Sequence, residues 1–150
     1  MRLWLLLMLC PSLCWGACDS WAVGFGGRRD QFDHQAFAEW SSGRVSCYRT
    51  FAWDQRTQAL QFVRSLDVPY ELYGFSKGAE TVLWIMPRVT RRPRYVITIG
   101  GWYSVNFDFG RWRVPFDNWF DSSGAGNTSP GVHVPHVRHS HMQAWVNQFY

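Results

Sequence analysis

The chain has 150 residues, of which 47% are hydrophobic and 17% are charged, so its composition is that of one globular domain and excludes a disordered chain. Its formal net charge is +4, and Arg91, Arg92 and Arg94 form the only dense basic cluster. Charge this mild and this scattered argues against a nucleic-acid-binding protein.

The N-terminus is typical of a secretory signal. One arginine precedes a short apolar run from Leu3 to Leu9, and small residues follow that run. The run is too short to span a bilayer as a helix. We therefore expect residues 1–16 to be a signal peptide, residues 17–150 to be the mature domain, and the protein to be exported to the periplasm or secreted. A buried first strand is the alternative interpretation.

The rest of the chain alternates between strand and helix patterns. The expected strands are residues 21–25, 45–53, 70–73, 95–99 and 116–120, and the expected helices are residues 30–40, 55–66, 77–86 and 142–149. Asp54 is expected to cap the second helix. This alternation predicts a single α/β domain of three layers, with a mostly parallel central sheet of about five strands. Ligands of such sheets bind at the carboxyl ends of the strands.

Two glycines flank a serine where the third expected strand meets the third expected helix. The segment Gly74-Phe75-Ser76-Lys77-Gly78 matches the pattern G-x-S-x-G. In this context the sharp turn holds the serine hydroxyl out of the sheet, and the glycines leave room for the neighbouring strand and helix. A plain turn is the alternative, because the five-residue pattern by itself also arises by chance.

The remaining parts of a catalytic site follow in the order serine, acid, histidine. An earlier strand ends in Gly24-Phe25-Gly26-Gly27, whose amides are candidate oxyanion donors. Asp121 follows the last expected strand, and four histidines precede the closing helix. This order, with the glycine-flanked serine, resembles a small member of the α/β-hydrolase superfamily, of the minimal cutinase or lipase type, over nearly all of the mature chain.

The resemblance implies nucleophilic acyl transfer. Ser76 would attack a carbonyl, His139 would accept its proton, and Asp121 would orient the histidine. The amides of Lys77 and Gly26 would bind the oxyanion. Such a mechanism uses no cofactor. The expected protein is a monomeric esterase or lipase-like enzyme that acts on a small ester or acyl compound, with transient contact to a lipid or cell-envelope surface.

The resemblance also makes the first two strands parallel neighbours. Cys18 lies just before the first strand and Cys47 lies near the start of the second, so the two cysteines are expected at the same edge of the sheet. We expect them to form a disulfide bond in an oxidising compartment.

The choice among acids and histidines rests on their places along the chain. Asp121 is preferred because Asp117 lies inside a strand, with Asp108 as a third candidate. His139 is preferred because Ser140 is expected to cap the closing helix, which leaves His139 in the loop and His141 in the first turn.

Aromatic residues between the last two strands are candidates for substrate binding. Trp102, Tyr103 and Trp112 fall on the expected active-site edge and are candidates for an apolar cradle for an acyl group. Hydrophobic cover for the sheet edge is the alternative interpretation.

Two other classes of function fit parts of the sequence. The spacing of His133, His136, His139 and His141, with Asp121 nearby, is compatible with a zinc-dependent hydrolase. A non-catalytic, aromatic-rich binding domain on a hydrolase scaffold is the other, because a fold does not determine a function.

Overall fold

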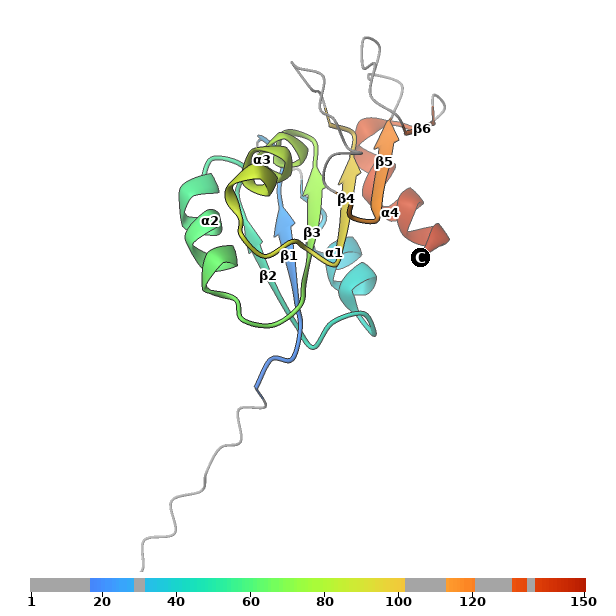
Figure 1. Cartoon of the computed structure of the whole chain (residues 1–150). Helices are drawn as coiled ribbons and strands as arrows, with labels where there is room; N and C mark the ends of the chain where they lie inside the picture. Colours follow the sequence, from blue (N-terminus) through green and yellow to red (C-terminus); the bar gives the residue numbers. More distant parts are fainter. Residues whose placement is uncertain (1–16, 29–31, 102–112, 121–130, 135–136) are drawn as a thin grey trace, which may run out of the picture.

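The computed structural model describes residues 17–28, 32–101, 113–120, 131–134 and 137–150. Within them, six parallel strands form one sheet in the order β2-β1-β3-β4-β5-β6 (Figure 1). The strands are β1 (Trp21–Phe25), β2 (Cys47–Phe51), β3 (Tyr70–Phe75), β4 (Tyr95–Ile99), β5 (Phe116–Phe120) and β6 (Val132–His133). The expected parallel sheet of about five strands is confirmed, and the two-residue β6 extends it along β5.

Helices cover both faces of the sheet, which makes three layers. They are α1 (His34–Ser41), α2 (Arg56–Ser65), α3 (Lys77–Ile85) with the 3₁₀ turn η2 (Met86–Arg88), and α4 (Met142–Val146) between the 3₁₀ turns η4 (His139–His141) and η5 (Asn147–Phe149). The predicted α/β class and single domain are therefore confirmed.

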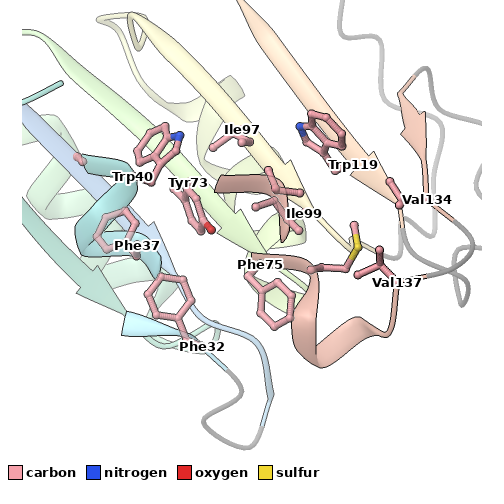
Figure 2. Packing of buried hydrophobic residues seen from close by; sticks show 13 residues of the cluster. Phe32, Phe37, Trp40, Tyr73, Phe75, Ile97, Ile99, Trp119, Val134 and Val137 are labelled. Carbon is pink, nitrogen blue, oxygen red and sulfur yellow. The ribbon is translucent and has the colours of Figure 1, made fainter. Parts of the chain in front are cut away.

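Two apolar clusters hold these layers together. One joins the sheet to α1 and α4 and contains Phe37, Tyr73 and Met142 among others (Figure 2). The other joins the opposite face to α2 and α3, through side chains such as Val63 and Val82. Alternate residues of β3 belong to different clusters, as expected for a strand that is buried on both faces.

Two helix starts differ from the expectation. Helix α1 begins at His34, because Asp33 is its N-cap and accepts a hydrogen bond of 2.9 Å from the Ala36 amide. Helix α2 has Gln55 at the N-cap position, so the predicted cap at Asp54 is wrong. The Gln55 side chain accepts from the amide of Ala52, which fixes the turn before the helix.

The expected disulfide bond between Cys18 and Cys47 is present, with 5.7 Å between the two Cα atoms. It joins the beginnings of the neighbouring strands β1 and β2, where Cys47 pairs with Trp21. Among the residues that the structure describes, none of the helices has the length and apolar character needed to cross a membrane.

Candidate active site

Ser76 lies in a sharp turn between the end of β3 and the start of α3. Its backbone angles are φ 54° and ψ −120°, in a region that residues with a Cβ rarely adopt. The Ser76 amide donates a hydrogen bond of 2.8 Å to the carbonyl of Ile99, at the end of β4. Strain of this kind is tolerated where the surroundings impose it, and it is concentrated at functional sites.

The two glycines of the motif allow α3 to lie very close to the sheet. A Cβ at Gly74 would come within 2.7 Å of the Ala79 Cα. A Cβ at Gly78 would collide with the Phe25 carbonyl group at the end of β1. The glycines are therefore required by close approach of backbone to backbone, as the sequence predicted.

The glycines that follow β1 correct one expectation. The amide of Gly26 donates to the Phe51 carbonyl at 3.0 Å and continues the ladder between β1 and β2. Gly26 is therefore not a free donor, and its predicted role in binding an oxyanion is not supported. The next residue, Gly27, lies directly against the serine, because a Cβ on Gly27 would come within 3.3 Å of the Ser76 Oγ.

Lys77 lies next to Ser76 at the start of α3, and its side chain is paired within the helix. Its Nζ forms an ion pair with Glu80, one turn further along α3. Its amide is the first of α3, where no preceding turn offers an intrahelical acceptor. A peptide N–H at this position is suited to stabilising negative charge beside Ser76.

His139 lies beside the end of β3. Its ring stacks on Phe75, the residue before the serine, with 4.8 Å between ring centroids and 28° between ring planes. His139 is partly buried, whereas His141 is exposed. The prediction that Ser140 caps the closing helix is wrong. His139, Ser140 and His141 together form the 3₁₀ turn η4, and Arg138 is the cap of that turn.

Helix α4 holds this histidine segment against the body of the protein. Met142 and Val146 are fully buried in the cluster under α1. The buried Gln143 accepts from the Asp33 amide at 2.8 Å and donates to the Tyr73 hydroxyl at 3.2 Å. Burial raises the pKa of the Tyr73 hydroxyl above its usual range, so the group stays neutral.

Of the two leading candidates for the acid, the structure describes Asp117 and not Asp121. Asp121 lies outside the described residues, although Phe120 before it ends β5 at the carboxyl edge of the sheet. Asp117 lies near the other end of β5, where it accepts hydrogen bonds from the hydroxyls of Tyr95 and Tyr150. This position makes Asp117 the weaker candidate.

Several other expected site residues also lie outside the described part of the chain. They are Trp102, Tyr103, Asp108, Trp112 and His136. In the part that is described, no group of three metal-ligating side chains is found. Since Asp121 and His136 are not among those residues, the zinc hypothesis depends on positions that the structure does not describe.

Sequence reasoning missed two contributors. Phe75 had no distinguishing signal, because a buried aromatic at a strand end is also expected of an ordinary core position. The sequence shows Gly26 and Gly27 as a pair after β1. Which of the two has a free amide beside the serine depends on where the hydrogen bonds between β1 and β2 end.

A parallel sheet in this order, with helices on both faces and a strained serine between β3 and α3, defines an α/β-hydrolase-like fold. Two solved structures with this fold match the chain. The "putative YdeN-like hydrolase" of Pectobacterium atrosepticum has a TM-score of 0.56 and 15% sequence identity, and the match covers 81% of this chain and 80% of that one.

The second is the "putative hydrolase of the alpha/beta superfamily" of Xanthomonas campestris pv. campestris, with a TM-score of 0.57 and 11% identity, covering 88% of this chain and 99% of that one. No protein-family model and no curated protein matches the sequence. Identities this low establish the fold, and the activity has to be argued from the site.

Proposed function

We propose that the protein is an exported, monomeric serine hydrolase that transfers acyl groups to water in the manner of an esterase or lipase. The observation that carries the proposal is the positive φ of Ser76, a non-glycine residue held between β3 and α3 at the carboxyl edge of a parallel sheet. An ordinary turn at this point would place a glycine or an asparagine in such a conformation.

In the proposed mechanism, the Ser76 hydroxyl attacks the carbonyl carbon of the substrate while His139 accepts its proton. The tetrahedral intermediate then collapses, and His139 returns the proton to the leaving group. Water then attacks the acyl-enzyme while His139 accepts its proton, and His139 returns that proton to the Ser76 oxygen as the acid product leaves. Asp121 is the proposed acid that orients the histidine, on the order of the residues along the chain.

The amides of Lys77 and Gly27 are the proposed oxyanion donors. The first begins α3, and the second belongs to the residue whose backbone lies against Ser76. Gly27 replaces Gly26 in this role because the Gly26 amide is already bonded to Phe51. Trp102, Tyr103 and Trp112 remain the proposed surface for the acyl part of the substrate.

The first experiment is covalent labelling of the full chain with a fluorophosphonate, followed by mapping of the modified residue. We expect Ser76 to be labelled. The Ser76→Ala variant should lose both labelling and hydrolysis of p-nitrophenyl esters, by about 10⁴-fold or more. The control is Ser42→Ala, an exposed serine after α1, which should leave both unchanged. Wild-type turnover by Ser76→Ala would contradict the proposal.

The second experiment compares two neighbouring histidines in the same turn. His139→Ala should lower the rate by about 10³-fold or more, because the base is removed, and His141→Ala should have a small effect. The opposite ranking would assign the base to His141. Small losses from both variants, or activity that a chelator removes and zinc restores, would favour the metal-dependent alternative.

A further inference from the structure

The end of the sheet opposite Ser76 is rich in arginine. Because the strands are parallel, their amino ends meet at one edge, together with the loops that lead into β2, β3 and β4 (Figure 1). Six arginines lie in or beside these loops: Arg44, Arg64, Arg88, Arg91, Arg92 and Arg94. This gathering could not be read from the chain order, in which the residues span 51 positions from first to last.

Only two of these six arginines, Arg44 and Arg94, form an ion pair with a carboxylate among the residues described. The carboxylate of Glu71, whose side chain is 3% exposed, pairs with Arg44 at 3.0 Å and accepts from Nε of Arg94 at 2.9 Å. Among the residues described, no carboxylate lies within ion-pair distance of the other four guanidinium groups. This edge of the molecule therefore keeps an excess of positive charge.

A cavity of about 270 Å³ opens between the loops at this edge, and Arg64 and Arg91 line it. Asp67 is the one carboxylate among the lining residues. Arg64 donates two hydrogen bonds, of 3.0 and 2.7 Å, to the Arg88 carbonyl, and Arg91 donates to the Asp67 carbonyl. A guanidinium group has five N–H donors, so both arginines keep donors for an anion.

The loop that carries Arg91 is fixed to the sheet. The Tyr70 hydroxyl donates to the Arg91 carbonyl, and the amide of Arg94 donates to the Tyr70 carbonyl at 2.7 Å. Positions held in this way need little ordering when an anion binds, which favours affinity.

We infer that this cavity binds the phosphate group of an anionic lipid, so that the amino edge of the sheet rests on a membrane surface. Arginine forks match phosphate oxygens in pairs. A lipid is favoured over a soluble phosphate because Arg88 and Arg92 lie at the same edge outside the cavity, with no carboxylate partner among the residues described. A membrane surface carries further anionic headgroups for these arginines, whereas a single bound phosphate does not. The proposed catalytic edge would then face away from the lipid.

The packing of one tryptophan near this edge supports the same partner. Arg88 stacks on the ring of Trp84 at 4.2 Å, and Arg56 lies against the same ring at 4.9 Å. Tryptophan rings combined with arginine side chains are typical of protein surfaces at the membrane interface. The inference does not depend on the proposed hydrolase activity.

The test is co-sedimentation of the full chain with vesicles of phosphatidylcholine, with and without phosphatidylglycerol. We expect binding to the anionic vesicles that weakens with added salt. The variant Arg64→Gln/Arg91→Gln should bind about thirty-fold more weakly, from the contribution of two arginines near an anionic surface. The control Arg49→Gln/Arg138→Gln makes the same change in net charge outside the cavity and its surrounding loops, and should lose less than about threefold.

A second variant keeps the test valid if the first is destabilised. Arg92 is exposed and makes no hydrogen bond or ion pair to the other residues described, so Arg92→Gln should fold normally and bind about fivefold more weakly. Equal losses in the cavity and control pairs, or equal binding to neutral vesicles, would overturn the inference. Displacement from vesicles by low concentrations of inorganic phosphate, or preference for a double-stranded oligonucleotide, would overturn the lipid assignment.

Discussion

Ser76 shows how single residues set the geometry of the site. A non-glycine residue with φ 54° and ψ −120° costs about 1–3 kcal/mol relative to one in an ordinary backbone conformation. Other contacts therefore have to hold Ser76 in this conformation. The bond from the Ser76 amide to Ile99 fixes one side of the turn. The absence of side chains at Gly74 and Gly78 lets α3 approach close enough to fix the other.

Gly78→Ala tests this close approach. Helix propensity alone would favour alanine by about 1 kcal/mol at a position inside α3. The added Cβ would instead collide with the Phe25 and Gly26 carbonyl groups, which are backbone and cannot rotate away. We expect the free energy of unfolding to fall by about 3 kcal/mol or more, as measured by urea denaturation.

Gly43→Ala is the control for that measurement. Gly43 has a φ of +74°, but a Cβ there would meet no atom within 4 Å. Its loss should be about 1 kcal/mol, from backbone strain alone. Losses of the same size in both variants would mean that the packing of α3 on β1 tolerates a side chain at Gly78, contrary to our interpretation of the motif.

At the scale of elements, β2 is an edge strand that is fixed by links outside the sheet ladder. It lies at the edge of the sheet and pairs only with β1 among the strands described. The disulfide bond joins it to the start of β1, and just outside the ladder the amide of Ser46 donates to the Ser20 side chain at 3.1 Å. These links fix the beginning of an edge strand whose Tyr48 and Arg49 are exposed.

Replacing both cysteines, as Cys18→Ser/Cys47→Ser, should lower the free energy of unfolding by about 2–4 kcal/mol. The bond spans 29 residues of sequence, and its removal gives the unfolded chain more conformational freedom. Urea denaturation measures the effect. Reductant should destabilise the wild type by a similar amount and leave the double variant unchanged, whereas a wild type that is insensitive to full reduction would refute this prediction.

At the scale of the whole molecule, four tyrosines link stability to alkaline pH. Burial raises the pKa of the hydroxyls of Tyr70, Tyr73 and Tyr95 above their usual range, and raises that of Tyr150 to about 12. Hydrogen bonds from the Tyr95 and Tyr150 hydroxyls to Asp117 act in the same direction. Ionised tyrosine is therefore disfavoured in the folded chain.

The sign of the pH dependence follows from these shifts. Above about pH 10 the unfolded chain releases its tyrosine protons while the folded chain keeps them. Folding stability should be fully present below about pH 10 and fall as the pH rises towards about 12. Urea denaturation at a series of pH values measures this loss, and a midpoint that stays constant over the range would contradict it.

Tyr150→Phe is the matched variant for this measurement. It removes one of the four shifted groups, together with the hydrogen bonds of that hydroxyl to Asp117 and Trp119. Its stability should be lower at neutral pH and should fall less steeply with rising pH than that of the wild type. An unchanged slope would mean that Tyr150 does not take part in the linkage.

The sequence by itself was enough for the class of fold and for the candidate nucleophile. Residues 21–25 and 95–99 were predicted to the residue, because a strand buried on both faces is a short apolar run with clear ends. The serine was identifiable because strand, glycine-flanked serine and helix are contiguous in the chain. Helix starts were less predictable, since Asp54 and Gln55 both suit a cap and only local hydrogen bonds distinguish them.

Other features were decided only by the tertiary structure. Gly27 rather than Gly26 lies against Ser76, because the hydrogen bond of Gly26 to Phe51 belongs to a pairing between strands more than 20 residues apart. The contact of His139 with Phe75 depends on how α4 packs under α1, through Gln143. Arginines from separate loops meet at one edge for the same reason: long-range packing brings together residues whose local sequences carry no signal of one another.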